Sequence, residues 1–210
     1  MKLYSYFRSS SSWRVRIALA WKGLSFEYVP VHLLKDAHRA SEYLERNPGG
    51  TVPTLALDDG RHIGQSMAIL EYLEETHPTP PLLPKDVFLR AKARQLAEIV
   101  NSSTQPYQTL AVLKHVQTVL KGDEKAWAAH WIAQGLRGFL GEAVKWAGRF
   151  SVGDAPSFAD VCLLPQLFGA RRFGVDVTEF SPLLEIETHC LALPAFAGAV
   201  PERQPDAAAQ

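Results

Sequence analysis

The sequence predicts an α/β domain followed by an all-helical domain. Up to residue 80, short segments rich in aromatic and β-branched residues alternate with helical segments, whereas the later sequence has helical periodicity and no convincing strand. Four prolines fall within residues 78–84, and such a segment cannot continue a helix and favours an extended connection. We therefore place the first domain at residues 1–80, a linker at 81–86 and the helical domain at 87–210.

Composition and end signals define the elements of the first domain. Strands are predicted at Lys2–Phe7, Glu27–Leu33, Thr51–Leu57 and His62–Gly64, the last two forming a hairpin around Asp58-Asp59-Gly60. Helices are predicted at Ser12–Lys22, closed by Gly23, at Ser41–Arg46, and at Ser66–His77 with Ser66 as the cap. The resulting order, βαβαββα, is that of a thioredoxin-like domain.

The second domain has three helical signals. Phe88–Val119 is periodic but interrupted near Pro106, and Glu124–Trp146 carries an apolar stripe. A third helix opens at Ser157, where a serine and Asp160 three residues later form a capping box. We interpret this box as purely structural.

Charge balance, apolar runs and cysteine spacing exclude several classes of function. Lys and Arg number 22 and Asp and Glu also number 22, so there is no electrostatic case for nucleic acid. The N-terminal residues do not resemble a signal peptide, and the most apolar run, Leu191–Val200, is too short to span a bilayer. Cys162 and Cys190 lack the paired spacing of a zinc site, so we expect two buried free thiols. We expect a cytoplasmic protein that needs no metal or membrane.

Serines occupy positions 9–12, where the first strand ends and the first helix begins. The N–H groups of a helix start are unpaired and carry the positive end of the helix dipole, so an anion is stabilised there. A serine hydroxyl beside them can donate a hydrogen bond to a thiolate. A flexible serine linker is the alternative, but the apolar run before the serines and the helix directly after them argue against it.

Two further segments favour a peptide ligand. Pro53 lies inside a strand signal, which suits a sheet edge or a special turn. An edge proline with a trans bond is the commoner arrangement, but in a thioredoxin-like domain the residue before a cis proline, here Val52, offers its backbone to an extended peptide. A cap at Ser66 would hold a carboxylate, and Gln65 could accept from an ammonium group. A small thiol peptide with a free α-carboxylate satisfies all these sites, and glutathione fits.

With the two-domain plan, these residues resemble the glutathione transferases, and most closely their zeta class, the maleylacetoacetate isomerases. The serine motif is specific to that class, whereas the Val-Pro and Ser66 elements are shared across transferases. One departure is Ser11, because the class motif usually carries Cys there. The resemblance covers nearly the whole chain and is carried by residues 4–10, 13–19, 47–48, 52–55, 65–66, 69–75, 78–80, 105–106, 152–154, 159–160, 172–173 and 175–176.

The resemblance implies glutathione transferase architecture, a homodimer, and isomerisation of 4-maleylacetoacetate to 4-fumarylacetoacetate in tyrosine and phenylalanine breakdown. The glutathione thiolate would add to the cis double bond, rotation would follow, and elimination would return glutathione. We expect Ser9 to be the main thiolate donor, with Ser10 assisting and Ser11 able to donate as well. Val52, beside Pro53, should pair with the cysteinyl backbone of glutathione.

Other residues are expected to complete the site. Gln65 and Ser66 should hold the γ-glutamyl end. His38 is a candidate for the glycyl carboxylate, with a solvated loop histidine as the equal alternative. Gln105 and Thr109, beside the Pro106 break, would reach the site from the helical domain.

The proposed substrate is a small dicarboxylate, so cations should bind it. We expect Arg8 and Arg172 in this role, because a planar guanidinium suits a carboxylate. Arg14 and Arg16 alternate with apolar residues on a helix. Each is interpreted as the cation of a structural ion pair.

Three alternatives remain. A maleylpyruvate isomerase would act on a shorter diacid; such enzymes tend to carry a histidine where this chain has Gln105 and arginines where it has Leu110 and Ala111. A broad conjugating transferase or α-haloacid dehalogenase would use the same thiolate, although Ser11 disfavours a dehalogenase that needs a protein thiol. A non-catalytic binding module of the same fold would be expected to lose the serines or the ligand cap.

Overall fold

The computed structural model of the protein describes residues 1–208, which form two units. The first unit contains Met1–Pro81 together with the segment that begins at Leu193, and the second contains Leu82–Ala192. The sequence analysis placed the segment from Leu193 onward in the helical domain. The contacts that join it to the first unit link residues far apart in the chain, and local sequence patterns do not reveal them.

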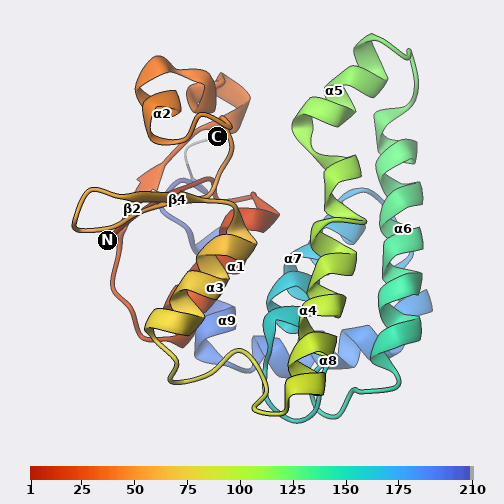
Figure 1. Cartoon of the computed structure of the whole chain (residues 1–210). Helices are drawn as coiled ribbons and strands as arrows, with labels where there is room; N and C mark the ends of the chain where they lie inside the picture. The colour runs from red at the N-terminus through yellow and green to blue at the C-terminus, as the bar shows by residue number, and fades with distance from the viewer. Residues whose placement is uncertain (209–210) are drawn as a thin grey trace. The chain divides into compact units, whose positions relative to one another are not determined.

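The first unit is built on a four-stranded sheet of order β2-β1-β3-β4. β1 is parallel to β2 and antiparallel to β3, and β3 is antiparallel to β4. α1 and α3 lie on one face of the sheet and α2 on the other (Figure 1), which confirms the predicted thioredoxin-like order. The elements are β1 (Lys2–Ser5), α1 (Ser10–Trp21), β2 (Glu27–Pro30), α2 (Ser41–Arg46), β3 (Thr54–Ala56), β4 (His62–Gly64) and α3 (Ser66–Thr76).

Apolar side chains pack on both faces of this sheet. Leu3 and Leu55 of the sheet are fully buried, as are Ile17 of α1 and Ile69 of α3. A second cluster contains Tyr6, Phe7, Val31, Tyr43 and Val52, with Ala207 packed against it. This second cluster contains residues from the loop before α1 and from the segment before β3, so it couples two parts of the predicted site.

β1, β2 and β3 are shorter than predicted. The chain leaves β1 at Tyr6, because the Tyr6 carbonyl accepts a hydrogen bond from the Ser9 N–H at 2.9 Å and forms a turn. The aromatic residues Tyr6 and Phe7 belong to this turn, although their side chains suit a strand. Strand-like composition therefore extends beyond the hydrogen-bonded ladder.

The segment from Leu193 onward contains α9 (Pro194–Gly198) and packs against the first unit. The rings of Trp21 and Phe196 meet edge to face, with their centroids 6.3 Å apart. The Arg16 Nε donates to the Ala199 carbonyl at 3.1 Å. Thus α1 lies against α9 as well as α3.

The second unit consists of helices. The predicted interruption at Pro106 is confirmed by a short 3₁₀ helix, η3, between α4 and α5, whereas α8 was not predicted. The described part of this unit contains an isolated bridge between Ala147 and Gly153 but no named strand. Its elements are α4 (Val87–Asn101), η3 (Gln105–Gln108), α5 (Leu110–Thr118), α6 (Glu124–Ala143), α7 (Phe158–Arg172), η4 (Val177–Phe180) and α8 (Ser181–Leu191).

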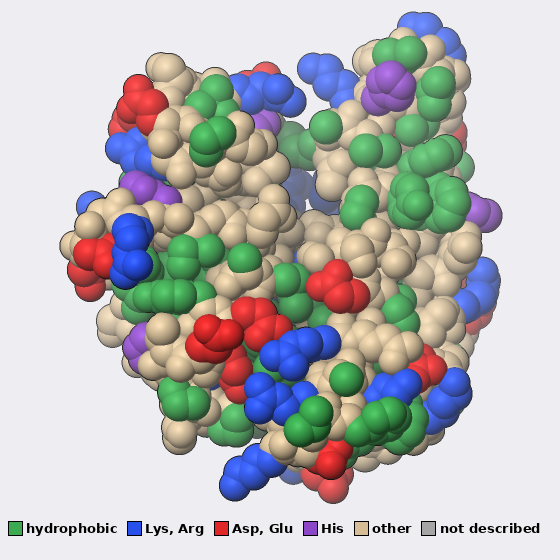
Figure 2. All heavy atoms as spheres, viewed as in Figure 1, with side chains coloured by type: hydrophobic (Ala, Val, Ile, Leu, Met, Phe, Trp, Pro, Cys, Tyr) green, Lys and Arg blue, Asp and Glu red, His purple; other side chains and the backbone are tan. Residues whose placement is uncertain are grey.

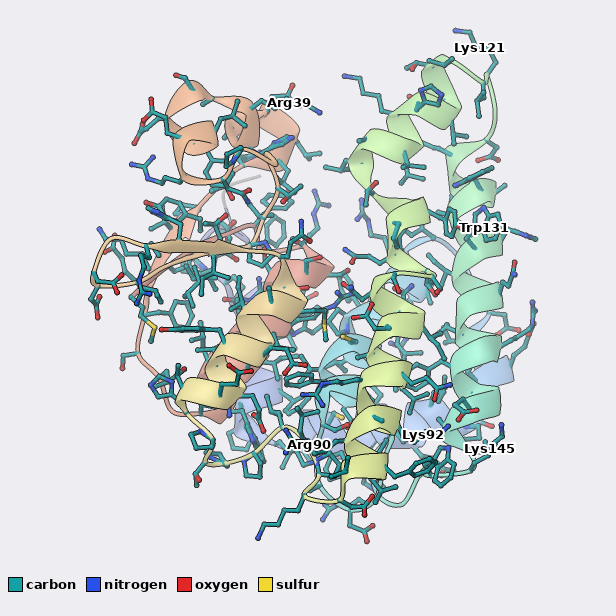
Figure 3. The ribbon with its side chains drawn as sticks, viewed as in Figure 1. Arg39, Arg90, Lys92, Lys121, Trp131 and Lys145 are labelled. Atoms are coloured by element: carbon teal, nitrogen blue, oxygen red, sulfur yellow. The ribbon has the colours of Figure 1, made fainter. Side chains whose placement is uncertain are left out.

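Aromatic contacts fix η3 against α6. The Trp127 Nε1 donates to the Tyr107 carbonyl at 3.0 Å, and the Tyr107 ring stacks on Trp131 with centroids 4.3 Å apart. Figure 3 shows Trp131 on α6, and hydrophobic side chains gather at this end of the unit in Figure 2. These contacts hold the short helix on which Gln105 lies.

The capping box at α7 is confirmed and is built around a buried carboxylate. Asp160 accepts hydrogen bonds from the Ser157 N–H at 2.8 Å, the Ser157 hydroxyl at 2.9 Å and the Ser151 N–H at 2.8 Å. Burial raises the Asp160 pKa, while these hydrogen bonds oppose the rise. The box anchors the central helix to the preceding loop, in agreement with a structural role.

Cys162 and Cys190 are buried free thiols, as expected. Within residues 1–208, no helix is long and apolar enough to cross a membrane. Across the same residues, no three His, Cys, Asp or Glu side chains form a group that could hold a metal ion.

Candidate active site

Strand register brings three predicted site segments to one end of the sheet. Tyr4 pairs with Thr54, and Thr54 pairs with Gly64. The chain therefore leaves β1, enters β3 and leaves β4 at the same end of the sheet. The serine run follows β1, Val52-Pro53 precedes β3, and Gln65-Ser66 follows β4, so all three meet there.

Ser9 is the N-cap of α1. Its backbone is extended (φ −68°, ψ 117°), and its hydroxyl oxygen accepts from the Ser12 N–H at 3.2 Å. The helix begins at Ser10, two residues earlier than predicted, because Ser9 and not a later serine forms the cap. Since the Ser9 oxygen acts as an acceptor towards the helix, its O–H can donate outward to an anion. Ser10 and Ser11 lie in the first turn, where the helix dipole also favours negative charge.

Two side chains hold the segment that contains Val52. The Tyr43 hydroxyl donates to the Thr51 carbonyl at 2.6 Å. The Asn47 Nδ2 donates to the same carbonyl and to the Thr54 Oγ1, both at 2.9 Å. The Val52–Pro53 peptide bond is cis, as the thioredoxin-like context favoured, and the ladder to β1 begins only at Thr54. The Val52 backbone thus lies outside the ladder, at a position suited to an extended ligand.

The predicted cap at Ser66 is wrong by one residue. The N-cap of α3 is Gln65, which has φ 64° and ψ 118°, and its carbonyl accepts from the Ile69 N–H at 3.0 Å. Positive φ is unfavourable for a residue with a Cβ and costs about 1–3 kcal/mol, and such strain is concentrated at functional sites. Ser66 is therefore the first residue of the helix.

A buried arginine lies behind Ser66. The Arg14 guanidinium is fully buried and donates from Nη1 to the Ser66 Oγ at 3.2 Å. Because the Ser66 oxygen accepts this bond, its O–H remains available to an incoming carboxylate. The sequence analysis did not predict this hydrogen bond to Ser66, although the position of Arg14 on the apolar face of α1 was a signal of burial.

Arg16 differs from the ion-pair prediction. It donates to the carbonyls of Phe7 at 3.0 Å and Ala199 at 3.1 Å, and to the Ser5 hydroxyl at 3.3 Å. Its hydrogen-bond partners are thus mainly backbone carbonyls. Tyr43, Asn47 and Arg16 hold the site segments in place, and their sequence context carried no sign of this task beyond the Asn47-Pro48 motif.

Arg8 and His38 also belong to the first unit. The Arg8 Nη2 donates to the Tyr6 hydroxyl at 3.2 Å, and its guanidinium lies 5.1 Å from the centroid of the Phe7 ring. His38 is half-buried on the 3₁₀ helix Ala37–Arg39, and its Nδ1 has no hydrogen-bond partner among residues 1–208. Burial and the charge of Arg39 lower the His38 pKa. His38 would therefore offer a hydrogen bond more readily than a positive charge at neutral pH.

The remaining predicted residues lie in the second unit. Gln105 and Thr109 flank Pro106, and the Thr109 hydroxyl donates to the Pro106 carbonyl at 3.2 Å. Arg172 is at the end of α7, with its guanidinium 5.3 Å from the centroid of the Phe173 ring. Its neighbour Arg171 is held by two hydrogen bonds to Glu187.

Three comparisons agree with the geometry. Residues 8–76 match the family described as "Glutathione S-transferase, N-terminal domain". A maleylacetoacetate isomerase from Dictyostelium discoideum is 48% identical over 99% of this chain and 96% of its own length.

Two solved structures extend the similarity to the whole fold. A maleylacetoacetate isomerase from Anaeromyxobacter dehalogenans, with dicarboxyethyl glutathione and citrate in its active site, is 49% identical with a TM-score of 0.90, covering 98% of this chain and 96% of its own. The holo structure of a bacterial maleylpyruvate isomerase of the zeta class is 39% identical with a TM-score of 0.95, covering 98% and 99% of the two chains.

Proposed function

The chain belongs to the zeta class of the glutathione S-transferase family, and from that premise we propose that it is the enzyme that isomerises 4-maleylacetoacetate to 4-fumarylacetoacetate with glutathione. One observation carries the proposal: the Ser9 hydroxyl caps α1 through its oxygen and keeps its proton for an anion at the helix start. Bound glutathione supplies the thiolate that adds to the conjugated cis double bond and leaves after rotation.

The residues around Ser9 can favour a thiolate at neutral pH without a metal. Lowering a thiol pKa of about 8.5 by about two units requires about 2.7 kcal/mol in favour of the anion. A hydrogen bond to a charged group contributes about 1.5–3 kcal/mol, and a helix start adds about 0.3–1 kcal/mol. Ser9 and the first turn of α1, with Ser10 assisting, are therefore sufficient.

The other segments at this end of the sheet fit the rest of glutathione. Val52, fixed by the hydrogen bonds to Thr51 and Thr54, pairs with the cysteinyl backbone. Gln65 and Ser66 hold the γ-glutamyl group, where the buried Arg14 cation adds to the positive end of the α3 dipole. We assign the glycyl carboxylate to His38. Gln105 and Thr109 contribute from the helical unit.

Arginines receive the carboxylates of the substrate in this proposal. Arg8 is held above the turn that precedes Ser9, so a carboxylate bound to it would lie near the thiolate. Arg172 binds the second carboxylate. The dicarboxyethyl glutathione in the Anaeromyxobacter relative supports a diacid, because that ligand carries two carboxylates on the glutathione sulfur substituent.

A maleylpyruvate isomerase is the second candidate. The high TM-score to such an enzyme favours it, whereas Gln105, Leu110 and Ala111 favour the longer diacid. Ser11 in the first turn of α1 weighs against a dehalogenase that relies on a protein thiol. Beyond the chemistry, and by family membership alone, we propose a cytoplasmic homodimer.

The test compares both diacids in one assay. Purified protein receives maleylacetoacetate or maleylpyruvate with and without glutathione, and an α-haloacid serves as the control electrophile. Faster turnover of maleylacetoacetate, dependent on glutathione, supports the proposal, and faster turnover of maleylpyruvate selects the second candidate. Tight glutathione binding with turnover of the haloacid alone would replace both with a dehalogenating transferase, and absence of glutathione binding would favour a non-catalytic module.

A further inference from the structure

The segment from Leu193 onward reaches the turn that carries Ser9. The Asp206 carboxylate accepts a hydrogen bond from the Phe7 N–H at 3.1 Å through Oδ2. Its other oxygen, Oδ1, accepts from the Tyr28 hydroxyl at 2.7 Å. Phe7 is two residues before Ser9 in the turn that ends β1. A carboxylate from the last part of the described chain therefore holds the peptide that leads into the thiolate site.

A cation holds the opposite side of the same residue. The Arg16 Nη2 donates to the Phe7 carbonyl at 3.0 Å, and its Nη1 contacts the Tyr6 carbonyl at 3.5 Å. The Phe7 N–H thus faces a carboxylate, while the Phe7 carbonyl faces a guanidinium. Hydrogen bonds with one charged partner are shorter and stronger than neutral ones. The turn is consequently fixed from both sides.

Arg16 and Tyr28, the two titratable groups that interact with Asp206, each keep one protonation state near neutral pH. Burial lowers the Arg16 pKa to about 10, and the neighbouring Tyr28 and Asp206 oppose this change. Arg16 is therefore still a cation at neutral pH. Burial raises the Tyr28 pKa, so its hydroxyl remains a donor. Asp206 accordingly accepts a hydrogen bond from a neutral phenol and interacts electrostatically with the Arg16 cation.

Packing extends the link from Asp206 to a second part of the site. Ala207 packs against the cluster formed by Tyr6, Phe7, Val31, Tyr43 and Val52. The Gln204 Nε2 donates to the Val200 carbonyl at 2.8 Å, which holds the segment in a compact turn before Asp206. The same segment thus contacts the turn before Ser9 and packs against the cluster that includes Val52, the residue expected to pair with the cysteinyl backbone.

We propose that Asp206 is a positioning residue for the isomerisation: by fixing the Phe7 peptide, it sets the place at which the Ser9 hydroxyl meets the glutathione thiolate. The inference rests on the proposed function, because it assigns a part in the same thiolate site. It does not require Asp206 to touch glutathione or substrate. Its effect on catalysis passes through the backbone of Phe7 and Arg8 to Ser9.

The first variant is Asp206→Asn, which keeps the size of the side chain. Its amide keeps one acceptor oxygen and replaces the other with an NH2 donor. The charge is therefore lost, and either the Phe7 N–H faces a donor or the Tyr28 hydroxyl must reverse its hydrogen bond. A small displacement of a catalytic group lowers rate strongly, and we expect kcat to fall at least about tenfold. The pKa of the bound glutathione thiol, followed by thiolate absorbance, should rise by about one unit.

Binding of S-methylglutathione separates positioning from a general loss of structure. This analogue has no ionisable thiol, so its dissociation constant should stay unchanged in Asp206→Asn if the rest of the site is intact. A merely structural role would lower the unfolding temperature or weaken the analogue without moving the thiol pKa. That result, or an unchanged thiol pKa and kcat, would overturn the inference.

Two further variants complete the experiment. Asp59→Asn is the matched control, because the Asp59 carboxylate also accepts a backbone N–H, that of Arg61 at 3.0 Å. Asp59 lies in the turn between β3 and β4, at the other end of the sheet from Ser9, and the variant should behave as wild type. Tyr28→Phe removes one support of Asp206 and should raise the thiol pKa by a smaller amount. If Asp206→Asn does not fold, an unchanged thiol pKa in Tyr28→Phe refutes the inference.

The same measurements distinguish failure of the proposed function from failure of the role of Asp206. A wild-type protein without glutathione-dependent turnover of either diacid would refute the proposed function. If the wild type is active and Asp206→Asn has the same thiol pKa and kcat, only the role of Asp206 is refuted.

Discussion

Replacing Ser9 with alanine should remove two separate contributions of one hydroxyl group. Towards α1, the Ser9 oxygen accepts the Ser12 N–H at 3.2 Å. Loss of an N-cap serine lowers the free energy of unfolding by about 1 kcal/mol. Outward, the same group donates its proton to the bound thiolate in the proposed function. Ser9→Ala is therefore expected to change both stability and catalysis.

The catalytic loss can be estimated from the hydrogen bond. A bond to a charged group is worth about 1.5–3 kcal/mol, which corresponds to about one to two units in the pKa of the glutathione thiol. With a wild-type thiol pKa of about 6.5, the ionised fraction at pH 7 then falls about threefold to twenty-fivefold. The rate should recover as the pH is raised, because the thiol ionises at the higher pKa.

Two other substitutions separate the contributions. Ser9→Asp keeps a strong N-cap and a favourable charge at the helix start, so its free energy of unfolding should stay close to that of wild type. It has no proton to donate at neutral pH and repels the thiolate, so its activity should fall below that of Ser9→Ala. Ser9→Thr keeps both the cap and the donor and should retain most of the activity.

The assays are urea unfolding and the pH profile of kcat for the glutathione-dependent isomerisation. We expect Ser9→Ala to move the rising limb of that profile to higher pH by about one to two units. If Ser9→Ala and Ser9→Asp both keep the wild-type profile, the hydroxyl is not the thiolate donor and the reasoning fails.

Three other predictions concern different parts of the molecule. Arg172→Ala should raise KM for diacids much more than for uncharged electrophiles; Arg171→Ala, whose guanidinium is bound to Glu187, is the control, and equal effects on both substrate types would contradict the assignment. Arg14→Met should raise the dissociation constant for glutathione about tenfold in calorimetry. The dissociation constant for glutathione amidated at the γ-glutamyl carboxylate should stay unchanged in this variant. A similar loss of affinity for both ligands would indicate a structural effect. Hydrogen bonds from Lys145, Lys92 and Trp146 lower the Glu142 pKa from 4.5 to about 2. Its contribution to stability is therefore present above pH 4.5 and is lost as the pH falls through about 2, so urea unfolding should show a smaller loss over this range in Glu142→Gln.

Sequence patterns predicted the fold well where local chemistry decides it. The capping box at Ser157 and Asp160 and the break at Pro106 depend on neighbouring residues, and both are confirmed. Strand ends were less predictable, because Tyr6 and Phe7 have strand-like side chains but belong to a turn. The start of α3 was misplaced because its cap has positive φ at Gln65, where a glycine or an ordinary cap residue would have been the usual signal.

The site was predictable as three segments but not as a connected network. The serine run, Val52-Pro53 and Gln65-Ser66 each carry a local signal, and the strand register brings them together. Arg14 behind Ser66 and Asp206 beside Phe7 are contacts between residues far apart in sequence. No periodicity or spacing encodes such pairs in a single sequence.

The first unit is discontinuous, because residues 1–81 are completed by the segment from Leu193 onward. During synthesis, the sheet and the serine turn leave the ribosome long before Ala199 and Asp206 do. Arg16 and the Phe7 peptide must wait for these partners until the whole helical unit has been translated. A nascent chain that has not reached this segment therefore lacks the groups that hold Arg16 and the Phe7 peptide. The thiolate site is therefore complete only in a chain that has been translated as far as Asp206.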